Sequence, residues 1–238
     1  MLTKNLTFVT QGTRKLGVRS TYRRILISQE HRFIFHRIPK AANSTIIKTL
    51  LAMDPMIDYG SAGYSDSKAK NKFYLHPWDL SIRDSVSARR NFYYFCFTRN
   101  PFDRTLSSYL DKFKEGDKRL LKYRKKTGSD EVPSFDEFVR YLEKGGLHED
   151  IHWIPQTMII PAPKKISFIG KVEKIENDLR AVTEKIFPGA SYKGPVNHNP
   201  HSTGASGKRE IYYSSDLIRR VARLFRKDLR LLGYGWHN

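Results

Sequence analysis

Two polar segments of this chain, each placed after an apolar run, carry the residue types that bind phosphate. The first runs from Lys40 to Thr45, between the apolar residues 33–38 and a helical apolar pattern that begins at Ile46. A loop that leads into a helix presents unpaired backbone N–H groups, and the helix dipole adds partial positive charge there. Because Lys40 adds a full charge, this segment predicts a pocket for a phosphate-bearing ligand.

The second segment begins at Arg99, where the apolar run 91–98 ends, and it includes Ser107 in the helix predicted after Pro101. Arginine offers a planar fork of donors and serine offers one more, so the two side chains can hold one phosphate from two sides. Ligands of open α/β sheets bind at the carboxyl ends of the strands. We therefore expect both segments to face one binding site.

The charge of the chain and its motifs indicate two other classes of function. The 43 Lys and Arg outnumber the 24 Asp and Glu, and a formal charge of +19 implies acidic partners. A nucleic-acid-binding protein is one alternative, although the sequence has no helix-turn-helix, zinc or RNA-recognition signature. A nucleotide-dependent phosphotransferase is the other. The Lys40 segment lacks the glycines and the final Gly-Lys-Ser/Thr of a Walker A loop, which disfavours ordinary NTPase chemistry.

Strand and helix patterns alternate along the chain and must position these segments. This alternation predicts an α/β domain with a central parallel sheet flanked by helices. We expect strands at 32–37, 91–98 and 165–170, helices at 43–53, from Pro101, at 118–126, from Ser134 to Gly145, at 174–187 and at 215–232, and polar loops at 54–72 and 193–208.

Length predicts one domain over residues 31–238, preceded by a basic arm or peripheral element at 1–30. The single cysteine, Cys96, lies in an apolar run, so we expect it to fill the core of a protein in a reducing compartment. No stretch approaches the roughly 18 apolar residues of a membrane span, and the first residues lack a hydrophobic signal core. We expect a cytoplasmic protein without an integral membrane segment.

The Lys40 segment followed by the Arg99 segment, each between a predicted strand and a predicted helix, resembles the sulfotransferases that use 3′-phosphoadenosine 5′-phosphosulfate. The resemblance is greatest to their Golgi-type carbohydrate branch, sulfotransferase family 2. Residues 152–156 (HWIPQ), 168–173 (FIGKVE) and 224–234 extend the resemblance, which spans about residues 32–236. It implies a P-loop-like nucleotide-binding fold and transfer of a sulfuryl group to a hydroxyl. The implied acceptor is an acidic or neutral glycan, with a small-molecule alcohol as the alternative.

The resemblance also implies roles for individual residues. Arg99 and Ser107 would hold the 3′-phosphate, and Lys208 and Arg209 would close over the donor from the late loop. Members of that branch carry a membrane anchor and often disulfides, so a trimmed Golgi lumenal domain is the alternative to a cytoplasmic location. The residues implied for the 5′-phosphosulfate are Lys40, Ala41, Ala42, Asn43, Ser44 and Thr45.

By analogy with phosphoryl transfer, sulfuryl transfer needs in-line placement, stabilisation of the leaving phosphate and a base for the acceptor hydroxyl. Lys40 is the predicted stabilising group. His76 is the first choice for the base, because it lies between the two segments, where related glycan sulfotransferases place a histidine, and an ordinary pKa near 6.5 suits the task. His36 and His152 are the alternatives, although His36 can instead point into the core and His76 can be a turn histidine before proline.

Aromatic and histidine residues elsewhere offer candidates for acceptor binding. Trp78, Trp153 and His152 are the predicted substrate-binding residues, with core packing as the alternative for both tryptophans. His198 and His201 are expected to be solvated in the late loop. The histidines lack the spacing of metal ligands, so we expect no metal site.

Overall fold

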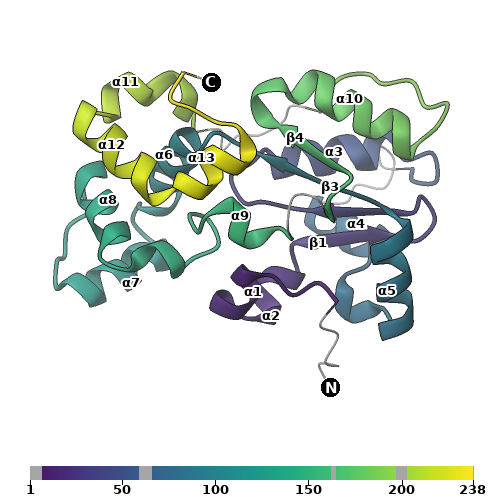
Figure 1. Cartoon of the computed structure of the whole chain (residues 1–238), viewed down its shortest axis with the longest axis horizontal. Coiled ribbons are helices and arrows are strands. Elements are labelled where there is room, and N and C mark those ends of the chain that lie inside the picture. The colour runs from purple at the N-terminus through teal and green to yellow at the C-terminus, as the bar shows by residue number, and fades with distance from the viewer. Residues whose placement is uncertain (1–6, 59–65, 162–164, 197–202, 238) are drawn as a thin grey trace.

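A four-stranded sheet forms the centre of the protein, seen in a computed structural model that describes residues 7–58, 66–161, 165–196 and 203–237 (Figure 1). Its strand order is β1-β2-β3-β4. β2, β3 and β4 run parallel, whereas β1 is an antiparallel edge strand beside β2. The predicted α/β class is therefore confirmed, and the sheet is mixed. The strands are β1 (Ile25–Ser28), β2 (Phe33–His36), β3 (Tyr93–Thr98) and β4 (Phe168–Lys171).

Helices cover the sheet and form a second group beside it (Figure 1). The α-helices are α1 (Gln11–Leu16), α2 (Val18–Tyr22), α3 (Asn43–Met53), α4 (Asp66–Phe73), α5 (Ile82–Asn91), α6 (Pro101–Lys112), α7 (Lys118–Thr127), α8 (Phe135–Glu143), α9 (Gln156–Ile159), α10 (Ile175–Ile186), α11 (Arg209–Tyr212), α12 (Ser215–Leu224) and α13 (Arg226–Leu232). Short 3-10 helices are η1 (Pro77–Asp79), η2 (Gly146–His148), η4 (Val172–Lys174) and η5 (Ala205–Lys208).

Three helical predictions need correction. The predicted loop 54–72 contains helix α4, whose lysine-rich sequence has no apolar period to reveal it; residues 59–65 of that loop lie outside the described residues. Helix α5 was not predicted either, because its sequence also has no clear apolar period. The final predicted helix 215–232 is interrupted at Phe225, which has φ −105° and ψ 23° and buries its ring in the core.

Both faces of the sheet are buried, which explains the unbroken apolar runs of its central strands. Side chains alternate between the faces. Phe35 and Phe95 stack on one face, with ring centroids 4.9 Å apart, in a cluster shared with α3 and α10. Tyr94 packs on the other face in a cluster with Tyr22 and with Ala88 of α5. Cys96 is buried and free, as predicted for a core residue.

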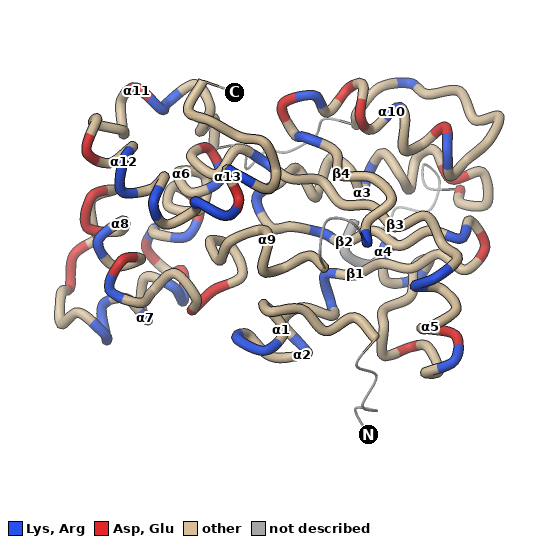
Figure 2. Tube along the Cα trace, in the orientation of Figure 1, with Lys and Arg blue, Asp and Glu red and all other residues tan. Residues whose placement is uncertain are grey.

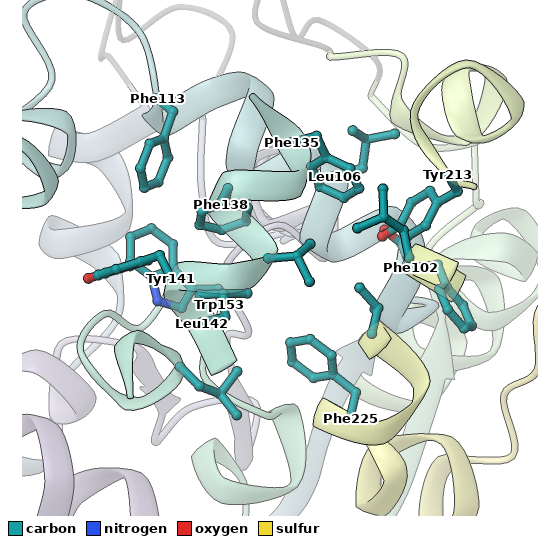
Figure 3. Packing of buried hydrophobic residues seen from close by; sticks show 14 of the residues in the cluster. Phe102, Leu106, Phe113, Phe135, Phe138, Tyr141, Leu142, Trp153, Tyr213 and Phe225 are labelled. Atoms are coloured by element: carbon teal, nitrogen blue, oxygen red, sulfur yellow. The ribbon is translucent and has the colours of Figure 1, made fainter. Parts of the chain in front are cut away.

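A separate cluster, here called the aromatic helical core, joins helices α6, α7, α8 and α12 (Figure 3). Rings of Phe113 and Phe138 lie 4.6 Å apart at its centre. Its buried members are Phe102, Leu106, Phe113, Leu120, Tyr123, Phe135, Phe138, Val139, Tyr141, Leu142, Leu147, Trp153, Ala205, Tyr213, Leu217, Val221 and Phe225. Helix α6 links this core to the sheet, because it begins directly after β3. None of the helices within the described ranges is long and apolar enough to cross a membrane.

Candidate functional site

A cavity of about 780 Å³ lies where β2 and β3 end. It brings together most of the residues predicted to bind the donor. Those that line it are Lys40, Ala42, Asn43, Ser44, Thr45, Arg99 and Ser107, together with His152 from the predicted acceptor set. Ala41, also predicted, is instead fully buried in the core under the loop. Further lining residues include Arg24, Arg37, Lys70, Asp111, Val172 and residues 203–207.

The loop between β2 and α3 has an unusual backbone for a segment without glycine. Lys40 and Ala42 have φ angles of 66° and 52°. This left-handed conformation costs a residue with a side chain about 1–2 kcal/mol. Ala42 is also the N-cap of α3 and provides no side-chain hydrogen bond to the helix start. The start of α3 thus has no side-chain cap, and residues 43–45 of its first turn line the cavity, as an anion-binding helix start requires.

Lys40 is held by a carboxylate inside this cavity. Its Nζ lies 3.1 Å from Oδ2 of Asp111 on α6, and Lys112 binds the same oxygen at 2.7 Å. Burial lowers the pKa of Lys40, while Asp111 opposes that shift. Burial alone would raise the pKa of Asp111, but the hydrogen bonds and charges of Lys112 and Lys40 lower it to about 2. Asp111 is therefore charged at neutral pH, and its carboxylate favours the charged form of Lys40.

Arg99 leaves the end of β3 and is fixed through its backbone. The side-chain amide of Gln156 accepts a hydrogen bond from the backbone N–H of Arg99 at 3.0 Å and donates one to the Arg99 carbonyl at 2.8 Å. The Arg99 guanidinium donates to the carbonyl of Lys40 at 3.4 Å and to the hydroxyl of Ser206 at 3.1 Å. Arg99 and Lys40 thus lie in one site, as the two segments predicted.

The late loop contributes through residues that were not predicted. Thr203 hydrogen-bonds to Ser107 at 3.0 Å, and Ser206 donates to Asp103 at 3.0 Å. Arg209, expected to close over the donor, pairs instead with Asp103 and donates to the carbonyl of Trp236. Its charge is used to attach the loop to α6.

Lys208 is exposed and, like Arg209, is absent from the lining of the cavity in the described part of the chain. From the late loop it is Thr203 and Ser206, among others, that line the cavity, where they contact Ser107 and Arg99. A polar, turn-rich loop gives no sequence signal for which of its hydroxyls face a cavity.

His152 is the histidine that lines the cavity. Its Nδ1 lies 2.5 Å from Oδ1 of Asp150, and Asp150 also binds Arg119 at 3.2 Å. Burial lowers the pKa of His152 to about 4, although the hydrogen bond to Asp150 opposes this shift. The ring is therefore neutral at pH 7, and its Nε2 is the atom left to receive a proton.

His76 lies beside the cavity rather than in its lining. Its Nδ1 hydrogen-bonds to the carbonyl of Ile25 at 2.8 Å, and its ring centroid is 4.8 Å from that of Trp78. Burial lowers its pKa, and the charges of Arg37 and Lys70, which do line the cavity, contribute. His76 thus occupies the edge of the site, beyond Arg37.

His36 and Trp153 belong to the protein interior. His36 is 1% exposed, its Nδ1 is 2.8 Å from the Tyr94 hydroxyl, and burial lowers its pKa to about 3. The alternative that His36 points into the core is confirmed. Trp153 is 2% exposed in the aromatic helical core, and its indole N–H donates to the carbonyl of Gly146 at 2.9 Å. Its predicted stacking on a sugar is therefore wrong.

The solvated histidines of the late loop and the expected lack of a metal site remain to be considered. His198 and His201 lie outside the described residues. Within the ranges that are described, no group of three or more His, Cys, Asp or Glu is arranged to hold a metal ion.

Several residues that shape the site were not predicted for that role. Arg104 is 1% exposed and donates to the carbonyls of Pro39 at 2.9 Å, Ile154 at 2.8 Å and Ile151 at 3.1 Å. It therefore ties the Lys40 loop to the segment that carries His152. The only available signal was the position of Arg104 inside the segment 99–107, because its three acceptors come from distant parts of the chain.

Comparison with known proteins supports one family. A model of the "Sulfotransferase family" matches residues 23–235. Carbohydrate sulfotransferase 14 of Danio rerio is 29% identical over 182 residues, which cover 68% of this chain and 48% of that protein. Carbohydrate sulfotransferase 10 of Gallus gallus is 26% identical, with 89% and 66% covered. Carbohydrate sulfotransferase 9 of Homo sapiens is 25% identical, with 86% and 50% covered.

The chain thus spans about half the length of the carbohydrate sulfotransferase 14 proteins that it matches. No solved structure matches it.

Proposed function

Because the chain belongs to the sulfotransferase family, we propose that it transfers a sulfuryl group from 3′-phosphoadenosine 5′-phosphosulfate to a hydroxyl of a carbohydrate. The observation that carries this proposal is the single cavity shared by the Lys40 loop, Arg99 and Ser107. A ligand with phosphates at two ends requires two separate anion sites in one cleft. The names of the relatives, all carbohydrate sulfotransferases, support the carbohydrate acceptor.

Two groups of residues that line the cavity suit the two phosphate-bearing ends of this donor. The loop from Lys40 to Thr45 would hold the 5′-phosphosulfate through Lys40 and the N–H groups at the start of α3. Arg99 and Ser107 would hold the 3′-phosphate, displacing hydroxyl contacts that they now make with Ser206 and Thr203. The donor supplies the sulfuryl group, while the protein supplies position and charge.

Lys40 would stabilise the charge that develops on the leaving phosphate. In this structure Asp111 holds its ammonium at 3.1 Å, next to the cavity. The strained loop keeps the lysine backbone close to the α3 start, so Lys40 and the helix N–H groups converge on one anion. Preorganised donors of this kind are worth about 10²–10³ in rate when one is removed.

A histidine would remove the proton of the acceptor hydroxyl, and two candidates remain. His152 lines the cavity and its tautomer is fixed by Asp150, so the geometry favours it. His76, the first choice from sequence, has its Nδ1 fixed by the Ile25 carbonyl and lies at the edge of the site. His152→Gln and His76→Gln variants separate the two, because the true base is the one whose loss lowers kcat while donor affinity is kept.

A transfer assay with sulfur-35-labelled donor tests the proposed reaction. The acceptor panel contains acidic glycans, neutral glycans and small-molecule alcohols, and each reaction is run with and without a chelator. We expect label on a glycan and full activity with the chelator, because the proposed residues need no metal. The proposal fails if no acceptor is labelled and 3′-phosphoadenosine 5′-phosphate does not bind, or if ATP-dependent phosphate transfer requiring Mg²⁺ is found instead.

A further inference from the structure

Two arginines line the donor cavity at a place that the proposed donor contacts do not use. Arg24 precedes β1 and Arg37 follows β2, and the Arg37 N–H donates to the Arg24 carbonyl at 2.8 Å. The antiparallel pairing of Ile25 with His36 thus brings two cationic side chains together. Arg37 is only 7% exposed, and Arg24 is half-buried.

No carboxylate lies within ion-pair distance of these two guanidinium groups in the part of the chain that the structure describes. Neither guanidinium forms an ion pair there, and the Nε atom of each is buried without a hydrogen-bond partner. Arg37 donates to one carbonyl, that of Arg23. Burial and neighbouring arginine charges lower the pKa of Arg24 to about 10 and that of Arg37 to about 9, while Asp150 opposes the shift of Arg24. A buried charge without a partner is strongly unfavourable.

Two other arginines of this protein have partners for their charges. Arg104 is more deeply buried but donates to three carbonyls, and Arg220 binds the carboxylates of Glu143 and Asp136. Arg89 also has a buried nitrogen without a hydrogen-bond partner, but it does not line the cavity as Arg24 and Arg37 do. At Arg24 and Arg37 a ligand in the cavity, rather than the protein, can therefore supply the anion.

The surroundings of the pair are also cationic. No acidic residue precedes Glu30 in the sequence, and Figure 2 shows α1 and α2 with basic and no acidic positions. Arg23 lines a second cavity, of about 430 Å³, with Lys15, Lys118 and Lys122. Asp150 also lines it and binds His152 of the first cavity, so the two cavities are neighbours.

The order of strands places the arginine pair on the acceptor side of the reaction. Arg99 follows β3 and Lys40 follows β2, whereas Arg24 lies at the start of antiparallel β1, at the same edge of the sheet. Along this edge, Arg24 is on the opposite side of the Lys40 loop from Arg99. In-line displacement requires the acceptor to approach from the side opposite the leaving group. An anion at Arg24 would then belong to the acceptor.

We propose that Arg24 and Arg37 form a second anion subsite, which binds a carboxylate or sulfate ester of the acceptor and so selects an anionic glycan over a neutral one. This proposal rests on the proposed function, because it places the acceptor relative to the donor. Bidentate binding of a carboxylate or sulfate is the recognition for which arginine is best suited.

Binding of defined tetrasaccharides, measured by calorimetry with saturating 3′-phosphoadenosine 5′-phosphate, tests the subsite. The probes are unsulfated chondroitin tetrasaccharide, its carboxyl-reduced neutral form, and a carboxyl-reduced form that carries sulfate esters. We expect at least one charged probe to bind the wild-type protein about tenfold or more tighter than the neutral one, which is the strength of one charge-assisted hydrogen bond. Arg24→Gln and Arg37→Gln should remove this preference.

Controls keep the result interpretable. Arg223→Gln, at an exposed arginine of α12, removes the same charge elsewhere and should change nothing. Arg37→Lys keeps the positive charge on a smaller side chain, and it is measured in place of Arg37→Gln if that variant does not fold. Equal binding of neutral and charged probes to the wild-type protein overturns the subsite, and so does a tenfold loss of nucleotide affinity in Arg24→Gln, which assigns the arginines to the donor. Failure of the wild-type protein to bind the nucleotide counts against the proposed function itself.

Discussion

The aromatic helical core and the cavity at the ends of β2 and β3 use buried polar groups in opposite ways. In the core, the Trp153 indole donates to the Gly146 carbonyl, and the Tyr213 hydroxyl donates to the Phe102 carbonyl at 2.8 Å. In the cavity, Lys40 and Ala42 take left-handed backbones, and Arg37 keeps a buried Nε without a partner. In the first region these buried polar groups are paired, while the second holds a left-handed backbone and an unpaired guanidinium nitrogen in a small volume.

This difference separates the part of the protein that is organised for stability from the part that is organised to bind a ligand. Strained backbone and unpaired charge persist only where the surrounding structure holds them in place, and they gather at functional sites. Helix α6 belongs to both regions, since it carries Phe102 and Leu106 of the core as well as Ser107 and Asp111 of the cavity. Substitutions in the two regions should therefore separate stability from activity.

The largest effect is expected for Lys40→Ala. Losing the group proposed to stabilise the leaving phosphate should lower kcat/KM by about 10²–10³. Stability should change by less than about 1 kcal/mol, because Lys112 still binds Asp111. Activity assays and denaturant unfolding of the same samples check both statements. Lys125→Ala, at an exposed lysine of α7, is the matched control and should alter neither.

Phe138→Ala should show the reverse behaviour. Its ring is fully buried among Phe113, Tyr109 and Trp153, and deleting such a ring costs about 3–4 kcal/mol of unfolding free energy. The folded fraction should retain wild-type kcat/KM. A folded Phe138→Ala protein with a hundredfold loss of activity would mean that the two regions are not separable.

Acid should destabilise the protein through the cavity. The folded pKa of His152 is about 4, below the ordinary value near 6.5, so the unfolded chain binds more protons between these pH values. Stability is then fully present above pH 6.5 and falls as the pH drops toward 4, by up to about 3 kcal/mol from this residue. His152→Gln should flatten the slope of unfolding free energy against pH in that window. An unchanged slope would show that His152 is not buried in its neutral form.

The smallest effect is expected for Ala42→Gly. Glycine accepts a φ of 52° without strain, so the variant should lose the backbone strain of Ala42. This gain should exceed the added conformational entropy of the unfolded chain and stabilise the protein by about 0.5–1 kcal/mol. Ala88→Gly, in the regular helix α5, is the matched substitution and should destabilise by about 1 kcal/mol. Thermal or denaturant unfolding checks the sign. Destabilisation by both variants would indicate that the loop around Ala42 is not strained.

The parts of the fold that could be predicted from sequence depend on local patterns. The central strands appear as apolar runs, and the capping box of Ser134 and Glu137 marks the start of α8 as expected. Lys40 and Arg99 could be placed together because both follow parallel strands, whose ends share one edge of the sheet.

What could not be predicted depends on contacts between distant residues. Arg24 reaches the site only through the antiparallel register of β1 with β2, and a short strand in a basic segment does not reveal that register. Arg209 was expected at the donor because it is cationic and near the late loop, but the buried Asp103 lies closer and binds it. The helix α4 has no apolar period, so nothing local distinguishes it from a loop.

The most direct test of the whole account compares two nucleotides on two proteins. Calorimetry measures the affinity of 3′-phosphoadenosine 5′-phosphate and of adenosine 5′-monophosphate, which lacks the 3′-phosphate, for the wild-type protein and for Arg99→Ala. We predict that the wild-type protein prefers the doubly phosphorylated nucleotide by about tenfold or more, and that Arg99→Ala loses this preference while binding the monophosphate unchanged. Equal affinity of the wild-type protein for the two nucleotides would contradict a site in which Lys40 and Arg99 hold opposite ends of one donor.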